Sequence, residues 1–187
     1  MIRVGYQGIQ GSNSEEAAIQ LVKKHNFDQV LFLPLVSSFN VLDNVNNGNI
    51  DYGVIAIRNN TGGTVTESIQ TLKFLKLTLF DKITLPIHHY LYVKDKEVKE
   101  NDIKIIASHP QAFIQCKANL KKYYPNVLLL KDEDTATAAR KLGLELFDRN
   151  TAILCRRNAG EFNNLFLMKS HLEDRNDNTT DFEIYKK

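Results

Sequence analysis

Short runs of β-branched and other apolar residues alternate along the chain with longer stretches in which apolar residues recur at helical spacing. The expected strands cover residues 3–6, 30–33, 52–57, 83–93, 105–108, 127–130, 151–155, 165–169 and 182–185. The apolar positions of the helices between them are Ala17, Ala18, Leu21 and Val22, then Val41, Leu42 and Val45, then Ala112, Cys116 and Leu120, then Ala139, Leu142 and Leu146. This alternation predicts an α/β protein made of strand-helix-strand units on a mostly parallel sheet.

The apolar segment 84–93 is long for one strand, contains Pro86 and lies near the middle of the chain. We therefore interpret it as a crossing between two lobes. A single doubly wound sheet is the alternative, and periodicity alone does not separate the two arrangements.

Composition narrows the class of protein. With 187 residues, 43% of them hydrophobic and 25% charged, the chain can bury a sizeable core. Lys and Arg number 24 against 22 Asp and Glu, so the basic excess typical of nucleic-acid binding is missing.

No apolar run reaches membrane-spanning length and the start lacks a signal-peptide pattern, so we expect no membrane association and a cytoplasmic location. Cys116 and Cys155 have no metal-ligand spacing and are expected to be core thiols in a reducing compartment.

Two polar loops follow expected strands. Residues 8–16 place Gly8, Gly11 and Ser12 just ahead of a helix whose expected N-cap is Ser14. Such a helix start suits an anion such as a carboxylate, although a capped helix without a ligand would show the same pattern. The glycine spacing is not that of a dinucleotide site.

Residues 58–64 (Arg-Asn-Asn-Thr-Gly-Gly-Thr) are too rich in hydrogen-bonding side chains for an ordinary turn, and they follow a strand end, where α/β ligands usually bind.

The segment 108–116 (Ser-His-Pro-Gln-Ala-Phe-Ile-Gln-Cys) also joins a strand to a helix, on which Gln111 and Gln115 share a face. The adjacent Ser108 and His109 favour a helix cap with a satisfied histidine over a Ser/His nucleophile, because no orienting acid is evident. The histidines indicate no metal site. In a strand the side chains of residues 88 and 89 would point to opposite faces, and those of residues 25 and 171 have no ligand spacing.

Taken in order, these motifs resemble the catalytic domain of prephenate dehydratase over essentially the whole chain. The matching segments are Gly8-x-x-Gly11-Ser12-Asn13-Ser14, Asp51-Tyr52-Gly53-Val54-Ile55-Ala56-Ile57, Leu85-Pro86-Ile87-His88-His89, Ser108-His109-Pro110-Gln111-Ala112-x-x-Gln115-Cys116, Asp134-Thr135-Ala136-x-Ala138-Ala139 and Asp174-x-x-x-Asn178-x-Thr180-x-Phe182. The resemblance implies a fold like the type II periplasmic binding proteins, with a ligand cleft between two α/β lobes. Lobe 1 would take residues 1–80 and 172–187, and lobe 2 residues 81–171.

The resemblance also implies an activity. The ring hydroxyl and ring carboxylate of prephenate leave together to give phenylpyruvate, water and carbon dioxide, which requires a proton donor and partners for two carboxylates but no cofactor. Carried over by position, the catalytic residues would be Thr180, Ser108 and Gln115. The substrate-binding residues would be Asn59, Ser12, Gly11, Asn60, Thr61, His109, Gln111 and Arg58. By analogy with the family's catalytic domains, which commonly pair, a homodimer is the expected assembly.

Two charged positions depart from the family pattern. Arg58 replaces a glutamate and Asp181 replaces an arginine, which indicates either a reversed ion pair or a changed pocket. Asn13 and Asn60 also make the expected site more polar than the family pattern.

The chain ends at Lys187 without the phenylalanine-sensing ACT domain, so we expect no feedback inhibition by phenylalanine through this chain. Two alternatives remain beside the dehydratase, namely a prephenate decarboxylase and a non-catalytic protein that binds or senses a small carboxylate.

Overall fold

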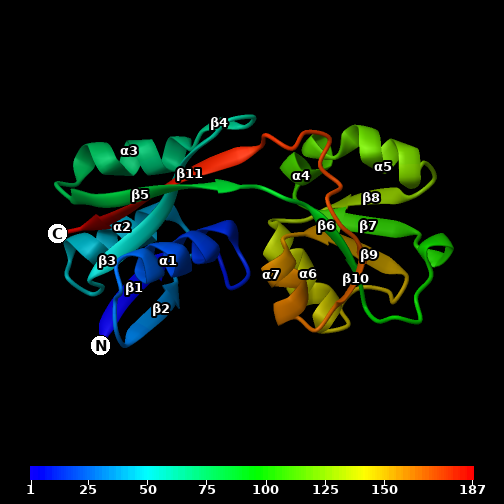
Figure 1. The fold of residues 1–187 in the computed structure, drawn as a ribbon, viewed down its shortest axis with the longest axis horizontal. Helices are drawn as coiled ribbons and strands as arrows, with labels where there is room; N and C mark the ends of the chain where they lie inside the picture. The colour runs from blue at the N-terminus through cyan, green and yellow to red at the C-terminus, as the bar shows by residue number, and fades with distance from the viewer. The chain divides into compact units, whose positions relative to one another are not determined.

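The computed structural model describes residues 1–187 and divides into two compact units. Unit 1 comprises residues 1–87 and 178–187, and unit 2 comprises residues 88–177 (Figure 1). The boundaries lie six or seven residues later than the sequence indicated. The reason is that strand β5 runs unbroken from Thr78 to Pro86 and stays paired with β11 of unit 1 over that length.

Unit 1 is built on a six-stranded mixed sheet in the order β2-β1-β3-β11-β5, with β4 paired to β3. Strands β1, β2 and β3 are parallel, whereas β11 is antiparallel to both β3 and β5. Its elements are β1 (Ile2–Tyr6), α1 (Asn13–Lys24), β2 (Val30–Pro34), α2 (Ser38–Asn46), β3 (Tyr52–Asn59), β4 (Gly63–Thr64), α3 (Thr66–Phe74), β5 (Thr78–Pro86) and β11 (Thr179–Lys186).

Unit 2 is built on a five-stranded mixed sheet in the order β10-β6-β9-β7-β8. Strands β7, β8 and β9 are parallel, and β6 is antiparallel to β9 and β10. Its elements are β6 (Tyr90–Val93), the short 3-10 helix η1 (Glu100–Asp102), β7 (Ile105–Ser108), α4 (Pro110–Gln115), α5 (Lys117–Tyr123), β8 (Leu128–Lys131), α6 (Thr135–Gly143), β9 (Thr151–Cys155), α7 (Arg157–Phe162) and β10 (Phe166–Lys169).

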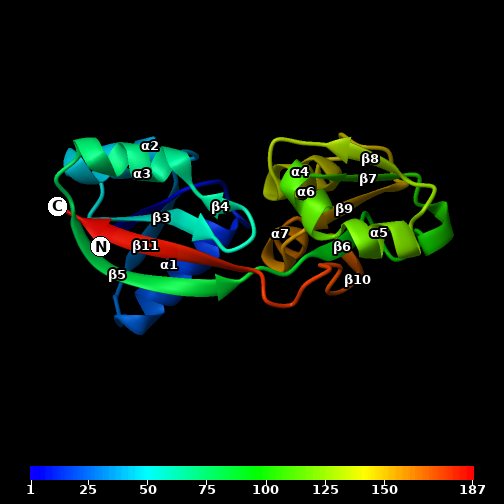
Figure 2. The same cartoon turned by 90° about the horizontal axis from the view of Figure 1, so that it is seen from above.

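Helices cover both faces of the unit 1 sheet because neighbouring residues of a strand point to opposite sides. Val54 and Ile184 pack under α1, while Ile55 and Tyr185 pack under α2. Figure 2 shows α1 on one side of the sheet and α2 with α3 on the other.

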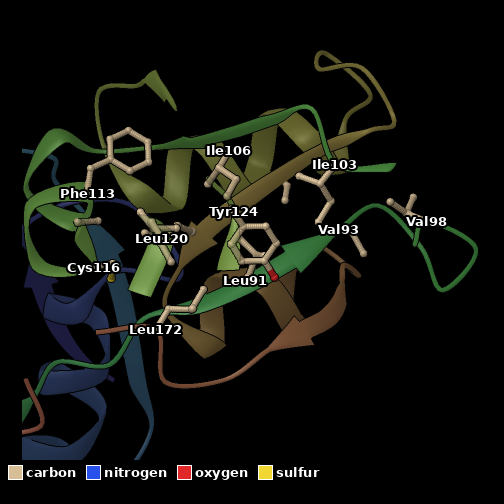
Figure 3. Packing of buried hydrophobic residues seen from close by; sticks show 13 residues of the cluster. Leu91, Val93, Val98, Ile103, Ile106, Phe113, Cys116, Leu120, Tyr124 and Leu172 are labelled. Atoms are coloured by element: carbon tan, nitrogen blue, oxygen red, sulfur yellow. The ribbon is translucent and has the colours of Figure 1, made fainter. Parts of the chain in front are cut away.

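Unit 2 has its own core, which α4 and α5 close on one face of the sheet (Figure 3). Cys116 is fully buried there, and Cys155 is fully buried in β9, so the prediction that both are core thiols is confirmed. Burial raises the pKa of both thiols. Leu146 is an exception to the predicted core, because α6 ends at Gly143 and leaves this side chain 69% exposed.

Two further local predictions were wrong. The expected strand 83–93 is two strands, because β5 ends at Pro86, which lacks the N–H that a continuing ladder requires, and β6 begins at Tyr90. The single doubly wound sheet is thereby excluded, since β5 and β6 belong to different sheets. The predicted mostly parallel arrangement also fails, since each sheet mixes both strand directions.

Candidate functional site

In unit 1, a network of side chains forms around Asn59, the last residue of β3. Its amide Nδ2 lies 2.9 Å from Asn178 Oδ1, 2.9 Å from the Thr179 carbonyl oxygen and 2.8 Å from Thr180 Oγ1, and donates to all three. Its Oδ1 accepts from the Thr61 hydroxyl at 2.7 Å and closes the following turn. One asparagine therefore holds the β3–β4 turn against the start of β11.

Thr180 lies directly opposite Asn59 in the antiparallel pairing of β11 with β3. The side chain is nearly buried, at 8% exposure. Its Oγ1 accepts the hydrogen bond from Asn59, so its own O–H proton is directed elsewhere and remains available for donation. The register shifts just after Asp181, and the pairing then continues with Phe182 opposite Ala56.

Asn178 completes the network from the buried side. Its Oδ1 accepts from Asn59 and, at 3.3 Å, from the Thr61 hydroxyl. Its Nδ2 is buried and has no partner in the structure. A buried amide donor without an acceptor is costly in a protein that binds nothing there, so this atom is a candidate ligand donor. Nearby, Asn60 Oδ1 accepts from the Thr179 N–H at 3.0 Å.

Arg58 and Asp181 are also register partners on β3 and β11. They form no ion pair, however. Asp181 Oδ1 instead accepts a 2.6 Å hydrogen bond from the hydroxyl of Thr84 on β5, and the Arg58 side chain is exposed. The reversed-ion-pair interpretation is therefore wrong, because the carboxylate is turned towards the neighbouring strand.

Helix α1, which follows the glycine loop, begins two residues earlier than predicted. Ser12, not Ser14, is the N-cap, and its Oγ accepts from the Glu15 N–H at 3.3 Å. The Glu15 carboxylate reaches back to the Gly11 N–H at 2.6 Å and to the Tyr6 hydroxyl at 2.9 Å. Part of the predicted anion site is thus already occupied by the chain's own carboxylate. Burial and this carboxylate raise the pKa of Tyr6.

The unit 2 candidates have different hydrogen-bond partners. Ser108 is fully buried at the end of β7, and its hydroxyl donates to the Leu154 carbonyl at 2.5 Å, so it ties β7 to β9. His109 is the N-cap of α4 and accepts from the Gln111 N–H at 3.1 Å through Nδ1. The predicted helix cap with a satisfied histidine is confirmed, and the Ser/His nucleophile reading is wrong.

Gln115 at the end of α4 contacts a residue that the site prediction missed. Its Oε1 lies 2.7 Å from His89 Nε2. Burial lowers the pKa of His89, so the imidazole is neutral, and it donates from Nε2 because an amide oxygen only accepts. His89 Nδ1 is then a buried lone pair without a partner. The signal that could have identified this residue was its place in the Leu-Pro-Ile-x-His motif.

A second missed feature is Glu173, which is buried in unit 2. Its Oε2 accepts from the His89 N–H at 2.9 Å, and its Oε1 contacts His88 and His171. Burial works to raise its pKa, but these hydrogen bonds outweigh burial and hold the pKa below the usual range. No single local motif in the sequence marks this group, because its members come from distant segments.

Comparison with solved structures defines the class of fold. The chain superposes on prephenate dehydratase from Arthrobacter aurescens, solved in complex with L-Phe, with a TM-score of 0.87, 24% identity and coverage of 100% of this chain and 60% of that one. A putative methionine-binding lipoprotein from Bacillus subtilis gives a TM-score of 0.51 at 14% identity, covering 100% and 83%. The structure is thus a two-sheet α/β protein that resembles prephenate dehydratases and periplasmic binding proteins, as the sequence predicted.

Comparison with curated sequences identifies the family. The chain is 29% identical over 183 residues to a bifunctional chorismate mutase/prephenate dehydratase of Pseudomonas aeruginosa, covering 98% of this chain and 48% of the relative. It is 28% identical to arogenate dehydratase 2 of Petunia hybrida, covering 97% and 44%. The family model described as prephenate dehydratase matches residues 4–187, so the chain belongs to the prephenate dehydratase family. It spans about half the length of the curated relatives that it matches.

None of the helices has the combination of length and apolar sequence that crossing a bilayer requires.

Proposed function

We propose that the chain catalyses the decarboxylative dehydration of prephenate to phenylpyruvate. In this reaction the bond from the ring to its carboxylate breaks to release carbon dioxide, and the electron pair enters the ring. The ring hydroxyl leaves together with the carbon dioxide, taking a proton to become water, and the ring becomes aromatic. Membership of the prephenate dehydratase family supports the proposal. The product is the keto acid of phenylalanine, which would place the activity in phenylalanine biosynthesis.

The observation that carries the proposal is the hydrogen bond from Asn59 to Thr180. Because Oγ1 accepts at 2.8 Å from Nδ2, the threonine proton is free to serve the departing hydroxyl. A hydroxyl that accepts one hydrogen bond also becomes a better donor through polarisation. Thr180 would thus assist loss of water, and Asn59 would position it.

Charged and amide donors would hold the substrate carboxylates. Arg58 has an exposed guanidinium without an ion-pair partner, and such a group can bind a carboxylate through two hydrogen bonds. The buried Asn178 Nδ2 is a second free donor in the same unit. In unit 2, Gln115 is held by His89, and Ser108 would act by positioning β7 rather than by touching substrate. Ser12, Gly11, Asn60, Thr61, His109 and Gln111 remain proposed contacts from the family pattern.

The test is turnover of prephenate at neutral pH, with phenylpyruvate measured by its absorbance in alkali. The wild-type chain should form phenylpyruvate without added metal or cofactor. Thr180→Ala should lower kcat by between about a hundredfold and ten-thousandfold, as expected for loss of an assisting proton donor. Thr180→Ser keeps the hydroxyl and should retain most of the activity. Arogenate should be assayed in parallel, since two of the relatives are named arogenate dehydratases.

Thr179→Ala is the matched control, because that neighbour contributes only backbone groups to the network. It should leave kcat near the wild-type value. Consumption of prephenate without phenylpyruvate would favour the decarboxylase alternative. A folded protein that binds prephenate but does not consume it would instead support the binding or sensing protein, and both results contradict the dehydratase.

We also propose a cytoplasmic location and a homodimeric assembly. The two buried free thiols fit a reducing compartment, and the assembly is carried over from the family. Size-exclusion chromatography with light scattering would test the second point.

A further inference from the structure

Three metal-ligating side chains of unit 2 converge outside the residues assigned to prephenate. Their donor atoms, one each from His88, His171 and Glu173, all lie within 4.8 Å of one another. His88 Nδ1 is 2.7 Å from Glu173 Oε1, and His171 Nδ1 is 3.1 Å from the same oxygen. Two imidazole nitrogens therefore converge on one carboxylate oxygen.

Backbone contacts hold this group in place. The Leu172 N–H donates to the His89 carbonyl at 2.9 Å, so the segments that carry the two imidazoles lie side by side. The Glu173 side chain is 1% exposed, and its Oε2 is fixed by the backbone N–H of His89. Its other oxygen is thereby oriented towards the imidazoles. Such outer hydrogen bonds are what orient carboxylate ligands in metal sites.

The group is open to solvent on the imidazole side. The side chain of His88 is 30% exposed and that of His171 is 56% exposed. The two rings meet edge to face with centroids 4.8 Å apart, and the Tyr90 ring lies 5.3 Å from that of His171. An ion would thus have a path of entry from solvent.

We propose that His88, His171 and Glu173 bind a zinc-like divalent transition-metal ion. Neutral imidazole and carboxylate are ligands that zinc takes at about 2.0–2.2 Å, which in tetrahedral geometry separates them by about 3.3 Å. The two nitrogen–oxygen spacings of 2.7 and 3.1 Å would open towards that value once the ion replaces the protons between nitrogen and oxygen. The two imidazole nitrogens, which lie within 4.8 Å of each other, would settle at the same spacing through rotation of the partly exposed rings. Two nitrogen donors disfavour magnesium and calcium, which prefer oxygen ligands.

The sequence indicated no metal site because it placed His88 and His89 in one strand. In the structure both residues precede β6, and the second imidazole comes from a segment beyond β10. The ligands His88 and Glu173 are 85 positions apart. The ion would therefore clip the segment that begins unit 2 to the segment near its end, and closing a long loop in this way stabilises the folded state.

The test uses the full chain with its affinity tag removed and its metals stripped with a chelator. Isothermal titration with zinc sulfate should show one ion bound per chain, and cobalt should give the visible absorption of a tetrahedral site. Zinc should also raise the melting temperature of the wild-type chain. Each of His88→Gln and His171→Gln should weaken zinc binding at least about tenfold, and the double variant should abolish it.

His25→Gln is the matched control. His25 Nε2 also contacts a carboxylate, that of Asp81 at 2.7 Å, but no second imidazole joins them. This variant should bind zinc as the wild type does. Because His88 and His171 are partly exposed, their variants should fold, which circular dichroism would verify. Absence of saturable one-to-one binding to the wild type would overturn the proposal, and so would binding that survives in the folded double variant.

Discussion

At the scale of single residues, Asn59 shows why an amide is required where a carboxylate of the same shape would fail. Its nitrogen donates to Asn178, Thr179 and Thr180, while its oxygen accepts from the Thr61 hydroxyl. Only a side chain with a donor and an acceptor on the same carbon can satisfy both sides.

Asn59→Asp tests this requirement. The aspartate would present oxygen to three acceptors, so we expect the free energy of unfolding to fall by about 1–3 kcal/mol. The kcat for prephenate should fall as well, because Thr180 loses the group that orients it. Urea denaturation and the phenylpyruvate assay measure the two effects. Asn49→Asp, at an exposed amide that donates one bond to Asn44, should change stability by no more than about 0.5 kcal/mol.

At the scale of elements, local signals predicted the strands that are buried and bounded by polar residues. Strands β7 and β9 begin and end where periodicity placed them. The stretch 83–93 was misread because an apolar run does not reveal where the ladder partner changes, and β4 was missed because two residues are too few for any period. The N-cap is Ser12 and not Ser14 for a related reason, since both serines lie near the start of α1 and only the backbone angles show that Ser14 is already inside the helix.

Helix α1 is tied to strand β5 by a small charge cluster. Lys24 and His25, at the end of the helix, contact the carboxylate of Asp81 at 2.6 Å and 2.7 Å. The bond from Lys24, followed by that from the Lys82 backbone and from His25, lowers the pKa of Asp81.

The contribution of this charge cluster to the stability of the fold depends on pH. Because the folded pKa of Asp81 lies below its unfolded value of about 3.9, the cluster stabilises the fold above that pH. Its contribution is lost as the pH falls through the folded pKa. Asp81→Asn should therefore lower stability at pH 7 by at most about 1 kcal/mol, since the pair is near the surface. Denaturation curves of both chains should converge as the pH falls below about 4, and a constant difference down to pH 2 would contradict the assignment.

At the scale of the whole molecule, each unit has hydrophobic clusters of its own. The cluster around Leu154 belongs to unit 2, and the cluster around Val54 belongs to unit 1. The chain passes between the units twice, after Ile87 and before Asn178, and Ile87 N–H donates to the Asn178 carbonyl at 2.8 Å. Each unit therefore has its own set of stabilising contacts.

Leu154→Ala should destabilise unit 2 by about 2–5 kcal/mol through loss of burial and the cavity that it leaves. Native-state hydrogen exchange should show the loss of protection concentrated in β6, β7 and β9, with β1 and β3 affected less. Val54→Ala should give the opposite pattern. Equal loss of protection in both units from either variant would show that they unfold as one.

The sequence by itself determined the α/β class and the family, because periodicity and collinear motifs are local properties that can be read along the chain. It also placed the two cysteines in the core. Only the tertiary structure decided which side chains meet. Thr180 receives a hydrogen bond from a residue 121 positions away, and Glu173 contacts an imidazole 85 positions away. Such pairs depend on strand register and on backbone hydrogen bonds between distant segments. The same register places Arg58 opposite Asp181, yet it leaves them unpaired because Thr84 on the neighbouring strand binds the carboxylate instead.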